Sequence, residues 1–150
     1  MSPAASDPAA APPDKLSLLV ISGTFERVHY ALVLASAAAA IGTPATLFFT
    51  DRALLALSAD EGSGPGWRSL PGEADTGGAT DDDRRRRGVA GFEELLSACA
   101  ELGVRFIVCE MGLRAIGLDV AALRRDVPLE VAGVVTFLAD ASSGGAMLTL

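Results

Sequence analysis

One short run of residues limits the folds open to this chain more than any other feature. The run Val104–Val108 is mostly β-branched or aromatic, ends in Cys109, and lies between Gly103 and Gly112. Its length, its composition and the flanking glycines predict a buried strand of a parallel sheet. Such folds place their ligands at the carboxyl ends of the strands, so Cys109 is either a working thiol or a small core residue.

Strand and helix patterns alternate along the rest of the sequence. Apolar runs predict four further strands, with helices between them. These strands are expected at residues 16–22, 45–50, 131–133 and 146–150, and the helices at 26–41, 52–58, 91–102, 112–117, 120–125 and 134–142. This order indicates an α/β fold with a mostly parallel sheet and right-handed crossovers.

The helix expected at residues 26–41 is apolar on almost every side, and Gly42 follows it. A helix of this kind is buried on more than one side. One side is expected to pack on the sheet and the other on a neighbouring helix or subunit, which argues against a monomer.

A single domain is expected at residues 15–150. Two segments of the chain, one before this domain and one inside it, differ in composition from the rest. Residues 1–14 are rich in Pro and Ala without periodicity and are expected to be a disordered tail. Residues 59–87 are rich in Gly, Asp, Arg and Pro and are expected to form a long flexible loop. Their charge block at 81–87, three aspartates and then four arginines, indicates either a lid or partner-docking loop or a solvated segment that neutralises itself.

Composition and charge exclude several classes of function. The net charge of −7 argues against nucleic acid as a partner, because phosphate contacts need Lys and Arg. No run reaches the roughly 18 apolar residues of a membrane span, and the first residues lack the pattern of a secretory signal. The single histidine and the cysteine spacing fit no metal site, and no nucleotide-binding fingerprint is present, so no cofactor is expected. We therefore expect a cytoplasmic protein with reduced thiols.

The turns after parallel strands meet at one edge of a sheet, and here they carry hydroxyl groups and one thiol. The pocket predicted around Cys109 comprises Ser22, Gly23, Thr24, Thr50, Glu110, Met111 and Gly112. A helix amino terminus beside the sulfur favours the thiolate, whereas a nearby Glu110 carboxylate opposes it. His29 lies near the start of its helix at the same edge and is either a candidate proton carrier or a partly exposed helix residue.

Cys99 is not expected to pair with Cys109. It lies on the apolar face of the helix predicted at 91–102, and the strand that ends in Cys109 follows at once. Helical and strand rises separate the two residues by more than about 10 Å in height, whereas a disulfide needs Cα atoms within about 7 Å. Cys99 is therefore assigned to the core, and Cys109 would react with an external partner.

Several blocks of the sequence together resemble the DsrE/DsrF-like family of small sulfur-trafficking proteins, in the branch often labelled peroxiredoxin-like. The blocks are residues 16–23, 37–42 leading into 47–50, 94–104, Cys109-Glu110-Met111 with Gly117, and 133–138. The resemblance implies a three-layer α/β sandwich around a five-stranded parallel sheet, assembled as a homotrimer or a hexamer. It also implies that Cys109 carries persulfide sulfur between donor and acceptor proteins. Many relatives have Ser where this sequence has Gly112, which removes a hydrogen-bond donor beside the sulfur.

Three functions remain open from the sequence. The first is sulfur transfer, with persulfide on Cys109 and small thiol-bearing sulfur-relay proteins as partners. The second is a non-catalytic oligomeric module that binds a ligand or regulates another protein. The third is a thiol peroxidase, for which the sequence has no Thr-x-x-Cys pattern and no arginine obviously placed to activate the thiolate.

Overall fold

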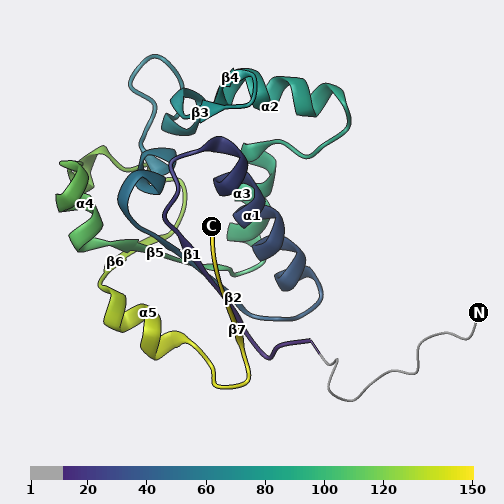
Figure 1. The fold of residues 1–150 in the computed structure, drawn as a ribbon, viewed down its shortest axis with the longest axis vertical. Helices are drawn as coiled ribbons and strands as arrows, with labels where there is room; N and C mark the ends of the chain where they lie inside the picture. The colour runs from purple at the N-terminus through teal and green to yellow at the C-terminus, as the bar shows by residue number, and fades with distance from the viewer. Residues whose placement is uncertain (1–11) are drawn as a thin grey trace, which may run out of the picture.

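The computed structural model describes residues 12–150, which form a five-stranded sheet flanked by helices (Figure 1). Every strand pair in this sheet is parallel. The order is β6-β5-β2-β1-β7, with β1 at Leu16–Val20, β2 at Ala45–Phe49, β5 at Arg105–Cys109, β6 at Leu129–Ala132 and β7 at Ala146–Thr149. The predicted α/β fold with a parallel five-stranded sheet is confirmed.

Helices cover the two faces of the sheet unequally (Figure 1). Two long helices pack together on one face, a single short helix lies on the other, and further short helices follow the carboxyl ends of β2 and β5. They are α1 at Phe25–Ala40 and α3 at Phe92–Glu101 on the first face, α5 at Val134–Asp140 on the second, and η2 at Asp51–Leu57, α4 at Glu110–Ile116 and η4 at Val120–Ala122 near the carboxyl edge. The result is a three-layer sandwich with one thick and one thin outer layer.

Alternation along β2 shows how the core is divided. Leu47 and Phe49 belong to the large cluster under α1 and α3, whereas Phe48 belongs to a small cluster under α5. The Phe48 ring stacks on Phe137 of α5, with ring centroids 4.7 Å apart. All five residues of β2 are buried, as expected for the central strand of a parallel sheet that is covered on both faces.

The apolar character of α1 is explained within the chain. The helix packs on the sheet with one side and on α3 with another, and Cys99 of α3 donates its thiol proton to the carbonyl oxygen of Leu32 at 3.5 Å. The large apolar side chains of α1 that stay exposed are Tyr30, in its second turn, and the capping residue Ile41. Burial of α1 on several sides therefore needs no second subunit.

The long loop expected at residues 59–87 is instead built from short elements that pack on the domain. They are η3 at Gly66–Ser69, β3 at Pro71–Gly72, β4 at Asp75–Thr76 and α2 at Gly77–Arg86. Trp67 is only 2% exposed and stacks on Phe92 of α3 at 4.7 Å between ring centroids. Gly77 has no room for a side chain beside the Trp67 carbonyl, so the glycines that suggested a loop allow close packing instead.

The charge block lies in α2, where its order suits a helix. Thr76 caps the amino terminus by accepting a hydrogen bond from the backbone nitrogen of Ala79 at 3.2 Å. Aspartates then precede arginines, which complements the helix dipole. Of the tail predicted at residues 1–14, residues 1–11 lie outside the described residues, and the backbone nitrogen of Asp14 donates to the carbonyl of Gly144 at 3.3 Å.

Candidate thiol site at the carboxyl edge

Three turns meet at the carboxyl edge of the sheet, and glycines bring them together. A Cβ atom on Gly23 would lie 2.7 Å from the Cβ atom of Arg52, in the segment after β2. A Cβ atom on Gly112 would collide with the Thr50 hydroxyl and lie 2.8 Å from the backbone nitrogen of Asp51. The turns after β1, β2 and β5 are therefore contiguous, and the structure gathers these predicted pocket residues along one edge.

Cys109 ends β5 and is also the residue that caps α4. Its sulfur accepts a hydrogen bond from the backbone N–H of Gly112, with an N–S distance of 3.3 Å. A donor aimed at the sulfur stabilises the charged form of the thiol. The residue is only 3% exposed and packs with Phe48, Ile107 and Phe137, so α5 covers the thiol.

Other residues of the predicted pocket make polar contacts that do not involve the Cys109 sulfur. Glu110 and Met111 are exposed, and the Glu110 carboxylate accepts from Arg114 on the next turn of α4 at 3.4 Å. The hydroxyl groups of Ser22 and Thr24 hydrogen bond to each other at 3.0 Å. The repulsion expected between the Glu110 carboxylate and a thiolate at Cys109 is therefore weakened, because this carboxylate is solvated and paired with a cation.

His29 is not brought near Cys109. It is buried on the α1 side of the sheet, where its ring packs on Phe25 and its Nε2 atom donates to the carbonyl oxygen of Ala90 at 2.9 Å. Its Nδ1 atom is buried without a partner. The expectation of a partly exposed residue was wrong, because the loop before α3 covers it.

The two cysteines lie on opposite sides of the sheet, and both are free thiols. Burial raises the pKa of the Cys99 thiol to about 12. A thiol that stays protonated in this way neither attacks nor binds metal. The structure keeps the two cysteines apart by placing them on opposite faces of the sheet, and Cys99 is a core residue, as predicted.

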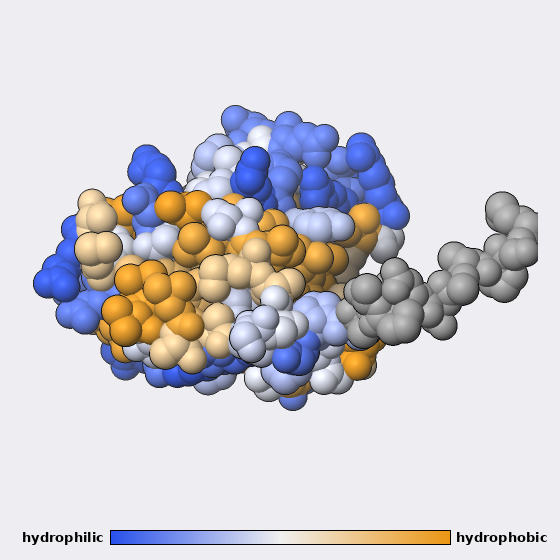
Figure 2. Space-filling view, turned by 60° about the horizontal axis from the view of Figure 1, so that its bottom comes forward, coloured by the Kyte–Doolittle hydropathy of each residue, from blue (hydrophilic) through white to orange (hydrophobic). Residues whose placement is uncertain are grey.

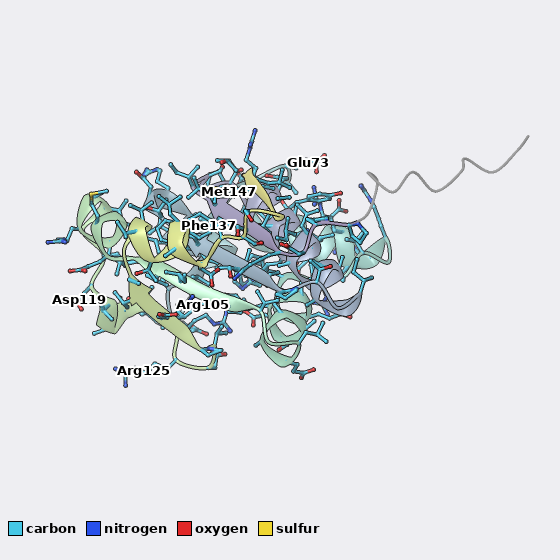
Figure 3. All side chains as sticks on the ribbon, turned by 90° about the horizontal axis from the view of Figure 1, so that it is seen from below. Glu73, Arg105, Asp119, Arg125, Phe137 and Met147 are labelled. Atoms are coloured by element: carbon cyan, nitrogen blue, oxygen red, sulfur yellow. The ribbon has the colours of Figure 1, made fainter. Side chains whose placement is uncertain are left out.

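A polar cluster anchors the last residue of α5, Asp140, to the sheet, at the end of the strands away from Cys109. The Asp140 carboxylate accepts from the Thr46 hydroxyl at 2.6 Å and contacts the Lys15 Nζ atom at 2.7 Å. Arg105, which is labelled in Figure 3, donates to Asp140 at 2.8 Å and also to Glu130 on β6. Burial alone would raise the pKa of Asp140, but the bonds from Lys15, Thr46 and Arg105 outweigh it and lower that pKa. Sequence analysis missed this cluster, although Arg105, a charged residue inside an apolar strand, could have indicated it.

A cavity of about 500 Å³ lies away from Cys109, beside the start of α3. Its lining includes Trp67, Arg68, Glu93, Arg124 and Asp126. Arg124 donates two hydrogen bonds to the Glu93 carboxylate and two to Asp126, all at 2.8 Å. The bond from Arg124 lowers the pKa of Glu93. Sequence analysis missed this cavity because the segments that line it are distant in sequence.

Residues 12–150 contain no group of three or more His, Cys, Asp or Glu side chains arranged to hold a metal ion. The helices described there are all too short or too polar to cross a membrane.

Comparisons with known proteins agree with the fold described above. A model of the DsrE/DsrF-like family matches residues 15–150. No curated protein matches the chain. Among solved structures, the chain is similar to that titled "Structure of Protein of Unknown Function MTH1491 from Methanobacterium thermoautotrophicum", with 18% identity, a TM-score of 0.50, and 91% of this chain and 98% of that chain covered. At this identity the likeness concerns the fold alone.

Proposed function

Because the chain belongs to the DsrE/DsrF-like family, which is associated with sulfur relay, we propose that it carries sulfur as a persulfide on Cys109. The observation that carries this proposal is the position of the Cys109 sulfur, at the carboxyl edge with the Gly112 N–H directed at it. Cys99 offers no alternative, because its pKa is raised to about 12 by burial. The function is thus assigned to one thiol.

The transfer is a thiolate exchange that needs no external oxidant or reductant. The Cys109 thiolate attacks the outer sulfur of a donor persulfide, R–S–SH, and a new S–S bond forms as the donor S–S bond breaks. The donor leaves as a thiolate and takes up the proton that Cys109 released. An acceptor thiolate then attacks the outer sulfur of Cys109–S–SH, and Cys109 leaves as a thiolate that the Gly112 N–H stabilises.

Access to Cys109 requires α5 to move, because the thiol is buried beneath it. This helix has seven residues, and Phe137 is its one buried side chain. Helices of this length are marginal without packing, and short segments with few buried contacts open locally in folded proteins. In this proposal α5 swings away to admit the donor and closes over the persulfide, which protects it from other thiols.

The partners proposed are other copies of the chain and small thiol-bearing proteins that donate or accept sulfur. A reducing compartment such as the cytoplasm suits this chemistry, because Cys109 must remain a free thiol between transfers. The exposed Glu110 and Met111 beside the thiol would be the first surface that such a protein meets.

The test is mass spectrometry of the full chain after incubation with a persulfide donor. Wild type is expected to gain about 32 Da per transferred sulfur, with the adduct mapped to the Cys109 peptide. Cys109→Ser should gain nothing, and Cys99→Ser, the matched control, should load like wild type. Equal loading of Cys109→Ser and wild type would remove the proposal.

One observation favours a second function, ligand binding without thiol chemistry. The cavity of about 500 Å³ beside α3 does not include Cys109 in its lining. Its size matches that of ordinary small-molecule sites. A ligand found by screening would then bind Cys109→Ala as tightly as wild type, and would lose affinity when Arg68 is replaced by Ala.

A further inference from the structure

The cavity beside the start of α3 combines charged and apolar side chains, unlike the surface around α5. In Figure 2 apolar side chains gather on the side of the molecule that carries α5. The cavity has a volume of about 500 Å³, and its lining comes from the segment after η2, from η3, from the first turn of α3 and from the segment between η4 and β6. Its hydrogen-bonding groups therefore select the ligand.

The carboxylates of the lining already have hydrogen-bond donors. The Glu93 carboxylate accepts from the indole N–H of Trp67 at 2.7 Å and twice from Arg124. Arg124 also donates twice to Asp126, so its guanidinium is occupied by four bonds at 2.8 Å. One oxygen of Asp60 accepts from two backbone nitrogens of its own loop, at 2.8 and 3.0 Å. These groups form a fixed wall in which the carboxylates are already hydrogen-bonded.

Arg68 is held in place by packing, yet most of its hydrogen-bond donors are unused. A Cβ atom on Gly78 would lie 3.0–3.1 Å from three guanidinium atoms of Arg68, so this group lies flat against the glycine. A Cβ atom on Gly64 would lie 2.8 Å from the Arg68 Cδ atom, and the guanidinium carbon is 5.3 Å from the centroid of the Trp67 ring. Among residues 12–150 its one hydrogen-bond partner is Asp82, at 3.4 Å, whereas a guanidinium has five N–H donors.

A positioned guanidinium with unused donors fits a ligand that accepts hydrogen bonds. A carboxylate does so with two oxygens that match the fork of the arginine. The charges of the lining cancel, because three carboxylates face three arginines: Asp60, Glu93, Asp126, Arg68, Arg124 and Arg125. A neutral wall of this kind tolerates one added negative charge better than the two of a phosphate, which the carboxylates would repel.

We propose that this cavity binds a small monocarboxylate with an apolar body, and that Arg68 binds its carboxylate group. The apolar body would lie against the uncharged part of the lining, which includes Ala59, Pro65 and Trp67. This ligand class rests on the ligand-binding function proposed above, and it is independent of sulfur transfer by Cys109.

The test uses the indole N–H of Trp67, the only tryptophan of the chain, as a reporter. It gives a single indole signal in a ¹H–¹⁵N NMR spectrum of the full chain, and its bond to Glu93 places it in the cavity wall. Three probes with the same benzyl body are titrated at pH 8. Phenylacetate carries one negative charge, phenylacetamide carries none, and benzyl phosphate carries about two. Phenylacetate is expected to bind at least about tenfold more tightly than either of the others.

Arg68→Gln should remove this preference, so that phenylacetate binds no more tightly than phenylacetamide. The matched control is Arg86→Gln, which removes the same charge from an exposed arginine of α2 outside the lining and should keep the wild-type affinity.

Equal affinity of wild type for phenylacetate and phenylacetamide, tighter binding of benzyl phosphate, or a preference that persists in Arg68→Gln would overturn the proposed ligand class. In each of these cases the cavity still binds a ligand, so the ligand-binding function stands. A Trp67 signal that none of the probes shifts would overturn both.

Discussion

On one side of β2, Leu47 and Phe49 pack under α1 and α3 in a core that extends to Trp67. On the other side, Phe48 meets Phe137 and a few residues around Cys109. The first side supplies most of the apolar burial that stabilises the fold. The second side closes over the thiol with one short helix. The stability of the fold therefore depends mainly on one face of the sheet, and access to the thiol depends on the other. Substitutions on the two faces should have different effects.

The largest expected effect is a loss of stability from a substitution on the face of the sheet that α1 and α3 cover. Trp67→Ala should lower the free energy of unfolding by about 3–5 kcal/mol, because it leaves a cavity between Phe25 and Phe92. Urea unfolding measures this change. A loss under about 1 kcal/mol would mean that the segment at 59–87 is not part of the core, and the contrast between the faces would weaken.

The next effect concerns the face of the sheet that α5 covers and the access to Cys109 there. Phe137→Ala should cost about 3 kcal/mol, and it should speed alkylation of Cys109 at least about tenfold, because α5 loses its buried anchor. The rate is measured in a Cys99→Ser background at several low urea concentrations. A rate that rises with urea as steeply as global unfolding would show that α5 does not open by itself. Leu138→Ala, on the exposed side of α5, is the matched control and should leave the rate unchanged.

Gly112 tests how closely the turns meet. Gly112→Ser places a Cβ atom against the Thr50 hydroxyl. We expect a loss of about 1–3 kcal/mol from overpacking. In a double-mutant cycle, Thr50→Ala should recover part of this loss, since it removes the colliding group. Simple additivity of the two substitutions would contradict the geometry at this edge.

The smallest effect is a pH dependence of the stability that Asp140 contributes at the end of α5. The pKa of Asp140 is lowered in the folded state, so its contribution is complete above the unfolded value of about 3.9 and is lost as pH falls through the folded pKa. Asp140→Asn should therefore cost about 1–2 kcal/mol at pH 7 and progressively less below pH 4. Unfolding of both proteins from pH 7 to pH 2 measures the difference. A constant difference over that range would exclude the ionic anchor.

Local patterns predicted the parts of the molecule that depend on nearby residues. The run before Cys109 is a buried strand, as predicted, and the alternation of helices and strands predicted a parallel sheet without its strand order. The separation of Cys99 from Cys109 followed from a short connection between one helix and one strand. These features depend on periodicity and rise per residue, which the sequence carries directly.

Other parts depend on contacts between distant segments, which periodicity does not carry. Phe137 meets Phe48 across 89 positions, so the covering of Cys109 was invisible in the sequence. The partner of His29 is the carbonyl oxygen of Ala90, in a loop with no pattern of its own. Glycines around Trp67 suggested a loop, because a residue needed for close packing looks the same in sequence as one needed for a turn.

The most direct test of the central claim is the site and rate of persulfide loading in the Cys99→Ser background. The account predicts one adduct of about 32 Da, on the Cys109 peptide, formed faster in Phe137→Ala than in Leu138→Ala. Absence of the adduct in both variants, while iodoacetamide still modifies Cys109, would contradict sulfur carriage on this thiol.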